Sequence, residues 1–402
     1  MDIIKLLKQN RGGHKLSRAV EALSEGGAQE FIRKVNRDLG VVIPRGSPTG
    51  RTCLVPYTNI EITWGGSVYL CCSDWVKFRL GVLSRHNTLL DMWNGRIART
   101  FREAMLTTEL NRVCKCDVCP EILGDRLPRL KNGELEFVGE RDDELDVASD
   151  DDAVRAIKAG VTKVDYMPKS IGLALDARCN LRCPSCRPGM ITTLPKYEEE
   201  ILELVAENLV TVAPTLRKLH LLGSGEVFYS PFGLQVLRSL SRERYPQLSV
   251  HLITNGMLCT ERNWKSLGAG AELIKMIGVS IDAATKESFE EIRLGASWRV
   301  LQRNLAFIRS MRRSGALKRT GINFVISAKN FREIPAFIRM GQEFEVDHCM
   351  FLLLQRWPDA LTAEKYKDLA VHLPTHPLHG EYRKILEDPI CSAPGVRLPS
   401  HS

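Results

Sequence analysis

Residues 174–189 read ALDARCNLRCPSCRPG and place Cys179, Cys183 and Cys186 in a C-x3-C-x2-C pattern directly after a β-rich run. Active sites of α/β sheets lie at the carboxyl ends of the strands, so we expect the three thiols there. Thiolates at this spacing suit one cubane iron–sulfur cluster, which normally takes four cysteines. Three ligands leave one iron open, as in catalytic metal sites. The spacing alone also permits a zinc ion completed by a distant histidine or cysteine.

From about residue 166 onward, β-rich runs alternate with helical stretches such as EEEILELVAENLV (198–210) and SWRVLQRNLAFIRSMRRS (297–314). Alternating βα units predict a parallel sheet with helices outside. Six strands are too few for a closed eight-stranded barrel, so we expect an α/β fold with a partial (β/α)6 TIM-like barrel. The six runs are SIGLALD (170–176), KLHLLG (218–223), LSVHLIT (248–254), IKMIGVSID (274–282), GINFVISA (321–328) and HCMFLLL (348–354).

The composition is that of a globular protein, with 402 residues, 44% hydrophobic, and a net charge of +8 from 56 basic and 48 acidic residues. The modest basic excess is spread over many segments, so nucleic acid is not the expected partner. No apolar run approaches the roughly 18 residues that cross a bilayer, and the start lacks signal-peptide features, which predicts a cytoplasmic location and no membrane partner. In that setting twelve cysteines favour metal or redox chemistry over disulfides.

Two motifs end the next strands. LLGSGEVFYSP (221–231) contains Ser224, Gly225 and Glu226, in which a glycine permits close backbone approach and a carboxylate offsets positive charge. LITNGM (252–257) ends the third strand in an Asn-Gly turn. A simple turn would explain either motif in isolation.

The fourth strand continues into VSIDAATKESFEEIRLG (279–295), which carries Ser280 and Arg293. Arginine suits a carboxylate through its two-pronged donor geometry. Taken alone, Arg293 could also be a surface residue beside Glu290 and Glu291.

Together these motifs resemble the radical S-adenosylmethionine superfamily. The resemblance implies that an electron from a [4Fe–4S] cluster on Cys179, Cys183 and Cys186 splits S-adenosylmethionine into methionine and a 5′-deoxyadenosyl radical, which takes hydrogen from a substrate. It also implies the cofactor-binding residues. Ser224, Gly225 and Glu226 would bind the cofactor's ammonium, Ser280 its ribose and Arg293 its carboxylate. Ser185 stands where many members have an aromatic residue, and Val227 where proline is common.

An earlier cysteine group reads C-x12-G-x4-C from Cys53 to Cys71, followed by the close pair Cys116 and Cys119. Two distant cysteines plus C-x2-C can make a four-thiolate site, for a cluster or for a structural zinc. Spacing prefers Cys71 to Cys72 and Cys116 to Cys114, and this choice stays open. The region resembles the SPASM or twitch modules that carry an auxiliary [4Fe–4S] cluster, although in that family the module usually follows the barrel.

The chain is therefore expected to be a radical enzyme acting on a peptide, a protein or a sugar-like small molecule, with a reductant protein such as flavodoxin or ferredoxin as partner. Two alternatives are an RNA-modifying radical enzyme and, from another class, a zinc-stabilised interaction protein without enzymatic activity. No catalytic residue can be named from the sequence. The expected domains are an N-terminal helical extension (1–50), a cysteine-rich α+β module (51–130), an acidic linker (131–165), the partial barrel (166–358) and a C-terminal helical tail (359–402).

Overall fold

A computed structural model describes residues 50–123, 125–137, 150–212, 215–221, 223–357 and 360–399. The expected N-terminal extension and the centre of the acidic linker lie outside the described residues. Among the described residues, no helix has both the length and the apolar character needed to cross a bilayer.

One sheet of ten strands organises the molecule, in the order β12-β11-β10-β9-β8-β7-β6-β1-β2-β3. Neighbours from β1 through β6 to β12 are all parallel, whereas β1–β2 and β2–β3 are antiparallel. The strands are β1 (Asn59–Thr63), β2 (Ser67–Tyr69), β3 (Gly81–Val82), β6 (Ser170–Ala174), β7 (Lys218–Leu221), β8 (Ser249–Thr254), β9 (Ile274–Ser280), β10 (Arg319–Ile326), β11 (His348–Leu353) and β12 (Val396–Arg397). The predicted partial barrel is thus confirmed, and β6 to β11 coincide with the six runs.

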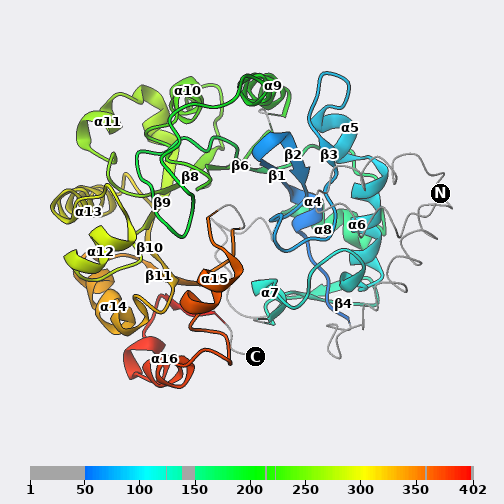
Figure 1. The fold of residues 1–402 in the computed structure, drawn as a ribbon. Coiled ribbons are helices and arrows are strands. Elements are labelled where there is room, and N and C mark those ends of the chain that lie inside the picture. Colours follow the sequence, from blue (N-terminus) through cyan, green and yellow to red (C-terminus); the bar gives the residue numbers. More distant parts are fainter. Residues whose placement is uncertain are drawn as a thin grey trace, which may run out of the picture.

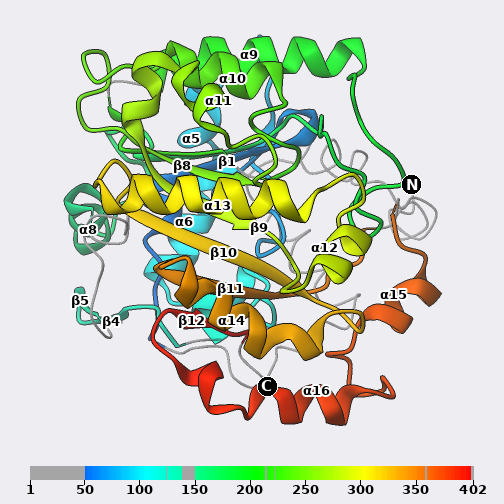
Figure 2. The same ribbon diagram turned by 90° about the vertical axis from the view of Figure 1, so that its left-hand side faces the viewer.

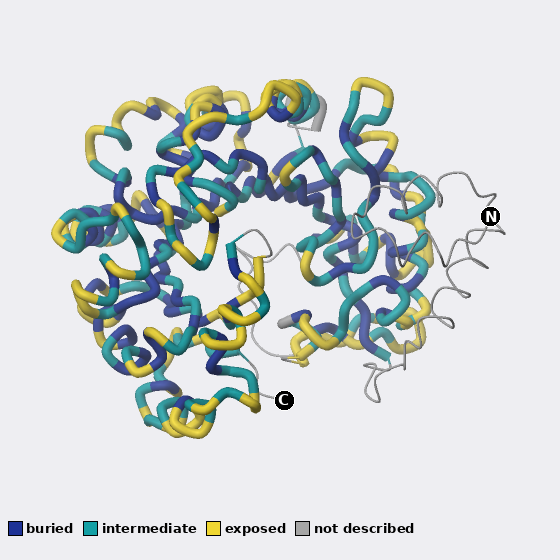
Figure 3. The backbone as a smooth tube through the Cα atoms, viewed as in Figure 1, coloured by how far each residue is buried: buried dark blue, intermediate teal, exposed yellow. Residues whose placement is uncertain are grey.

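Helices cover the outer face of the curved parallel sheet (Figure 1). Viewed from the side, α12, α13 and α14 lie in front of strands β9 to β11 (Figure 2). These helices and their neighbours are α9 (Lys196–Val212), α10 (Pro231–Ser239), α11 (Glu261–Lys265), α12 (Lys286–Ile292), α13 (Trp298–Arg313) and α14 (Ile334–Glu343). Their outward surfaces are exposed, whereas the strands beneath are largely buried (Figure 3).

Alternation along each strand explains this layering. In β7, Leu219 and Leu221 are buried on the helix-covered face, while Lys218 and His220 point to the other face, because successive side chains alternate. On β10, the ring of Phe324 packs 4.8 Å from that of Phe337 in α14. In these two strands an apolar face is therefore turned outward toward the helices.

The cysteine-rich module joins the barrel through β1, which pairs in parallel with β6 over five residues of each strand. A buried arginine, Arg102, secures the same junction. Its guanidinium donates to the carbonyls of Pro56 and Thr162 at 3.0 Å each and lies 4.3 Å from the ring of Trp93. The module's helices are α4 (Val55–Thr58), α5 (Leu89–Trp93), α6 (Arg96–Leu106) and α7 (Pro120–Leu123).

The remaining segments are short. Between module and barrel lie a two-stranded hairpin, β4 (Arg129–Lys131) and β5 (Glu134–Glu136), and helix α8 (Asp151–Lys158). Asp150 begins α8 by accepting hydrogen bonds from two amides of its first turn. After the barrel come α15 (Ala363–Leu369), α16 (His379–Leu386) and β12, so the C-terminal segment also adds a strand beside β11.

Candidate functional site

The cysteine loop follows β6 at the carboxyl end of the sheet. Its backbone is fixed by hydrogen bonds from Cys179 N to Ile191 O at 2.9 Å and from Cys186 N to Cys183 O at 3.0 Å. Cys179 is buried, Cys183 is half-buried and Cys186 is exposed. The three thiols thus run from the interior to the surface within one loop.

Two salt-bridged residues at the start of the loop shape its first turn. Asp176 accepts hydrogen bonds from the Arg178 guanidinium at 2.8–3.1 Å and from its backbone amide at 3.0 Å. Ser230, whose hydroxyl also accepts from Gly233 N and so caps α10, donates to the same carboxylate. Sequence analysis did not single out Asp176, because its partners are known only from the fold.

Gly225 brings the loop after β7 against the cysteine loop. A Cβ at this position would lie 2.2 Å from the carbonyl oxygen of Asp176 and 2.4 Å from that of Arg178. Only glycine permits such an approach between two backbones. The predicted Ser224–Gly225–Glu226 motif therefore lies directly against the predicted cluster loop.

Arg187 joins the same two loops from the other end and was also missed by sequence analysis. Its buried guanidinium donates to Ala177 O and, at 2.9 Å, to Ser224 O. It also lies 3.4 Å from the sulfur of Cys186. A basic residue after the third cysteine was the available signal, but a lone arginine near a surface loop is common.

Glu226 is buried beneath this contact. Its carboxylate accepts hydrogen bonds from the Thr254 hydroxyl and the Asn255 amide at 2.7 Å each, and from Phe228 N at 3.2 Å. Burial raises its pKa, and the backbone donors oppose that rise. The carboxylate is close enough to Cys179 to raise the pKa of that thiol, which burial already raises more strongly.

Arg293 lies close enough to the second cysteine of the loop to affect its pKa. Its guanidinium donates to Asp282 at 2.6 Å and to Ile281 O at 3.2 Å, rather than pairing with Glu290 or Glu291. Burial raises the pKa of Cys183, and the positive charge of Arg293 opposes that rise. Ser280, the last residue of β9, is half-buried on the inner face and is the register partner of Asn323.

Asn255 links the third strand to the loop. Its side-chain amide donates to Asn180 Oδ1 at 2.9 Å and approaches the Cys179 sulfur at 3.7 Å. The predicted turn of LITNGM is thus a contact to the first cysteine. The structure brings the four motifs predicted from sequence together around one loop.

The donor set suits an iron–sulfur cluster. Within the described ranges, no three His, Cys, Asp or Glu side chains converge closely enough to bind one metal ion. A four-iron cluster takes each thiolate on a separate iron, so its ligands need not meet at a point. The three thiols are nevertheless electrostatic neighbours, since both Cys186 and Cys179 raise the pKa of Cys183.

The second cysteine group gathers at the end of β2 in the module. Burial raises the pKa of Cys71 well above its usual range, and Cys53, Cys119 and Cys114 raise it further. The pKa of Cys114 is raised by burial and then by Cys53, Cys119 and Cys116. Cys53, Cys71, Cys114 and Cys119 therefore form one group of neighbouring thiols.

Cys72 and Cys116 lie at the margins of this group. Burial and then the carboxylate of Glu61 raise the pKa of Cys72 to about 12, and Asp74 and Trp75 of the following turn also affect it. Among the cysteines that raise the pKa of Cys71, Cys72 has the smallest effect. The Cys116 thiol donates toward Cys114 O at 3.9 Å; Cys119 raises the pKa of Cys116, and Cys116 in turn raises that of Cys114. Cys53, Cys119 and Cys114 each raise the pKa of Cys71, whereas Cys116 is not among the groups that affect it.

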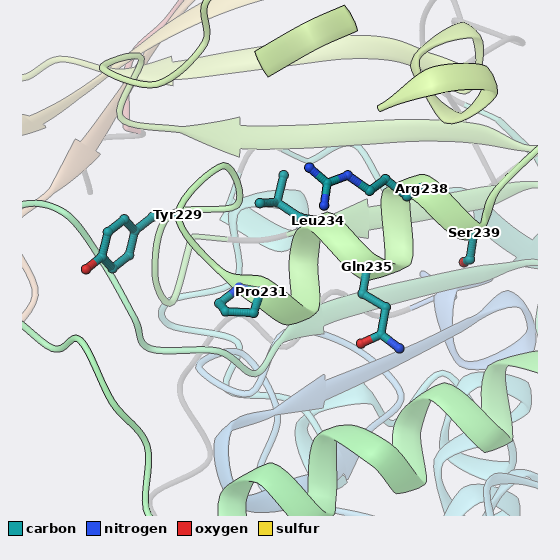
Figure 4. Close-up of a pocket in the computed structure, with 6 residues that line it drawn as sticks. All are labelled: Tyr229, Pro231, Leu234, Gln235, Arg238 and Ser239. Atoms are coloured by element: carbon teal, nitrogen blue, oxygen red, sulfur yellow. The ribbon is translucent and has the colours of Figure 1, made fainter. Parts of the chain in front are cut away.

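An open groove runs along α10 and contains none of the predicted ligands. Its lining is Tyr229, Pro231, Leu234, Gln235, Arg238 and Ser239. In Figure 4, Leu234 and Arg238 project to one side of the helix and Gln235 to the other, while Tyr229 lies in the loop before it. These residues converge on no common point, so we assign no chemistry to the groove.

Two family models match separate parts of the chain. Residues 176–340 match the family model described as the radical SAM superfamily, and residues 53–120 match SPASM, an iron–sulfur cluster-binding domain. An AdoMet-dependent heme synthase from Methanosarcina barkeri (strain Fusaro / DSM 804) is 29% identical over 181 residues, which are 44% of this chain and 48% of the relative. The chain thus spans about half the length of the curated relative that it matches.

Two solved structures are similar to parts of the chain at low sequence identity. SuiB from Streptococcus suis is 13% identical, with a TM-score of 0.40 over 75% of this chain and 60% of SuiB. The protein anSMEcpe with bound AdoMet is 19% identical, with a TM-score of 0.38 over 55% of this chain and 61% of that one.

Proposed function

The chain belongs to the radical S-adenosylmethionine superfamily and carries a SPASM iron–sulfur domain ahead of its barrel. On this premise we propose which residues hold the clusters and which bind the cofactor. We propose that Cys179, Cys183 and Cys186 hold the [4Fe–4S] cluster that binds S-adenosylmethionine. A cluster held by these residues would supply the electron for reductive cleavage of S-adenosylmethionine, the chemistry by which such enzymes take a hydrogen atom from a substrate.

The charges on the two sides of the cysteine loop carry this proposal. The buried carboxylate of Glu226 lies on the Cys179 side, and the guanidinium of Arg293 lies on the Cys183 side. The methionine part of the cofactor carries an ammonium and a carboxylate, which match this pair of opposite charges. Asp282 holds the Arg293 guanidinium in place at 2.6 Å.

Backbone fit supports the same assignment. Gly225 lets the loop after β7 lie against the carbonyls of Asp176 and Arg178, so the position of Glu226 relative to the cysteine loop is set by this backbone contact. Ser280, at the end of β9, is proposed to contact the ribose from the neighbouring strand. The proposed cofactor residues thus follow the ends of two strands of one sheet, β7 and β9.

We propose a second [4Fe–4S] cluster in the module, on Cys53, Cys71, Cys119 and a fourth thiolate. The spacing C-x2-C selects Cys116, whereas the neighbourhood of the thiols favours Cys114. The two single variants Cys114→Ser and Cys116→Ser decide between them through the iron and sulfide content of the reconstituted protein. The variant that removes the true ligand loses about half of the total iron, and the other keeps it.

Radical chemistry of this kind requires a reductant and a substrate. We propose a flavodoxin- or ferredoxin-type electron donor, and a peptide, protein or sugar-like molecule as substrate. An auxiliary cluster beside the barrel suits a reaction in which an electron leaves the product, or one in which the cluster orients the substrate.

The experiment is anaerobic reconstitution with iron and sulfide, followed by chemical reduction and measurement of 5′-deoxyadenosine. Wild-type protein should release 5′-deoxyadenosine, and Cys183→Ala should release none. Cys391→Ala, a lone cysteine of the C-terminal segment, is the matched control and should behave as wild type. Cofactor cleavage by Cys183→Ala, or stoichiometric zinc without labile sulfide in the wild type, would contradict the proposal.

A further inference from the structure

Helix α13, on the outside of the barrel, is strongly basic. Its sequence, WRVLQRNLAFIRSMRR, contains five arginines and no acidic residue. The three arginines in its second half are engaged by carboxylates or by a backbone carbonyl of the segment after α14, namely Arg309, Arg312 and Arg313. The basic residues that remain lie in the first half of the helix.

Arg299 and Arg303 are these two residues. They lie one helical turn apart, so they share a side of the helix, and both are exposed. Neither forms an ion pair with any residue that the structure describes. Arg299 is the second residue of α13, where a positive charge opposes the helix macrodipole. The stability of the helix therefore does not explain an arginine at this position.

The turn before α13 lies against the cysteine loop. Leu294 O accepts a hydrogen bond from Arg182 N at 3.1 Å, and an added Cβ at Gly295 would lie 3.6 Å from the side chain of Leu181. This turn connects α12 to α13, whose adjacent ends are visible in Figure 2. Arg299 follows Gly295 by four residues, so the basic start of α13 is next to the loop.

The loop adds a third exposed arginine to the same place. Arg182 directly precedes Cys183, its side chain is exposed, and it has no ion-pair partner within the described ranges. The one acidic residue of the loop, Asp176, is bound to Arg178 at 2.8 Å. We call Arg182, Arg299 and Arg303 the arginine surface.

The acidic residues of α12 do not cancel this charge. Glu290 accepts a hydrogen bond from the first amide of α13 at 3.0 Å, and Glu291 pairs with Lys329 at 2.6 Å. Glu287 is exposed and unpaired among the described residues, and the same is true of its neighbour Lys286. The region beside the cysteine loop therefore keeps an excess of positive charge.

An exposed set of arginines favours an acidic partner, because complementary charges steer association and orient the two surfaces. The position of the set beside Cys183 suggests what such a partner delivers, since the proposed cluster needs an electron. A nucleic acid is the other common polyanion, but it is usually bound by a stripe of basic residues that follows its phosphates. Three arginines around one loop fit the smaller footprint of a redox protein better.

We propose that an acidic electron-carrier protein docks on the arginine surface and delivers its electron at this side of the cysteine loop. This rests on the proposed function, because it assumes that Cys179, Cys183 and Cys186 hold the cluster that needs the electron. The step is a transfer of one electron: the carrier is oxidised by one, the cluster is reduced by one, and no atom or proton is exchanged.

The first test measures docking without chemistry. Binding of oxidised flavodoxin and of oxidised ferredoxin, two acidic one-electron carriers, to the reconstituted full chain is measured by calorimetry at low and high salt. Wild type should bind one of them, and the binding should weaken as salt screens the exposed charges. The double variant Arg299→Glu/Arg303→Glu should weaken the binding about tenfold or more. A glutamate in the first turn suits the helix macrodipole, so α13 should still form.

The second test separates electron delivery from cofactor cleavage. With the reduced carrier as the electron source, the double variant should form 5′-deoxyadenosine about tenfold more slowly than wild type. With dithionite, a small reductant that needs no docking surface, the two proteins should be equal. Arg244→Glu is the matched control, because Arg244 is exposed and precedes β8 at the amino ends of the strands. It should bind and react as wild type does.

The inference is wrong if the double variant binds both carriers as wild type does, or if neither carrier binds the wild type. It is also wrong if the double variant loses binding of single-stranded RNA and keeps binding of the carriers. Should the double variant misfold, Arg299→Gln and the salt dependence of wild-type binding still decide it. Failure of the wild type to form 5′-deoxyadenosine with dithionite would instead contradict the proposed function.

Discussion

Replacing Gly225 by alanine tests the contact on which the candidate site depends. The new methyl carbon would lie 2.2 Å from Asp176 O, whereas an ordinary contact is about 3.4 Å, so the two loops must separate by about 1.2 Å. Both loops are backbone at this point and cannot move aside as a side chain would. Reacting groups need placement to about 0.5 Å, and a displacement of 1 Å costs on the order of 100-fold in rate.

We therefore expect Gly225→Ala to lower 5′-deoxyadenosine formation about 100-fold per bound iron, and to lower the free energy of unfolding by about 1–3 kcal/mol. Gly189→Ala is the control, because it lies in the cysteine loop that Gly225 contacts and an added Cβ there meets nothing within 4 Å. Both variants are reconstituted anaerobically, assayed for 5′-deoxyadenosine and unfolded in urea. A Gly225→Ala protein with wild-type activity, or a Gly189→Ala protein equally impaired, would refute the reasoning.

Three further predictions follow from charged side chains. Arg187→Lys keeps the charge but cannot bridge two carbonyls, so a chelator should remove the loop's iron several-fold faster, as followed by visible absorbance. Arg102→Met leaves buried carbonyls without donors and removes the contact with Trp93. Urea unfolding should therefore show a free energy of unfolding lower by about 3 kcal/mol. Burial lowers the pKa of His220 to about 4 and of His251 to about 3, below the unfolded value near 6.5, so the unfolded chain binds more protons as pH falls below 6.5. The contribution of these histidines to the free energy of unfolding is thus complete above pH 6.5, and each loses about 1.4 kcal/mol of it per pH unit on acidification. When both are replaced by glutamine, the free energy of unfolding measured in urea should fall less between pH 7 and pH 5.

The barrel strands were predictable because their alternation is strong. In β7 and β8, apolar residues that face helices alternate with Lys218, His220 and His251, and the runs are separated by helical stretches. The place of β1 was not predictable in the same way. Asn59–Thr63 is a short run whose partner, β6, lies far along the chain, and pairing at that distance leaves no local signal.

In the candidate site, too, the residues that belong to local motifs were predictable from the sequence, whereas those defined by contacts between distant segments were not. The order of the motifs placed Gly225 and Glu226 near the cysteines, because consecutive parallel strands end at one edge. Asp176 and Arg187 were missed, since their roles depend on Ser230 and on the carbonyl of Ser224, which only the fold brings near.

Because β1 pairs with the much later strand β6, its edge has no partner while the intervening chain is being synthesised. A chain made from its N-terminus completes β1 at Thr63 long before Ser170 begins its partner, so the module waits with an open strand edge. Unpaired edges recruit other strands and promote aggregation. A truncation that keeps only the barrel would expose the matching edge of β6. The β1–β6 pairing therefore couples the cysteine-rich module to the barrel, and we expect each part to aggregate when it is produced without the other.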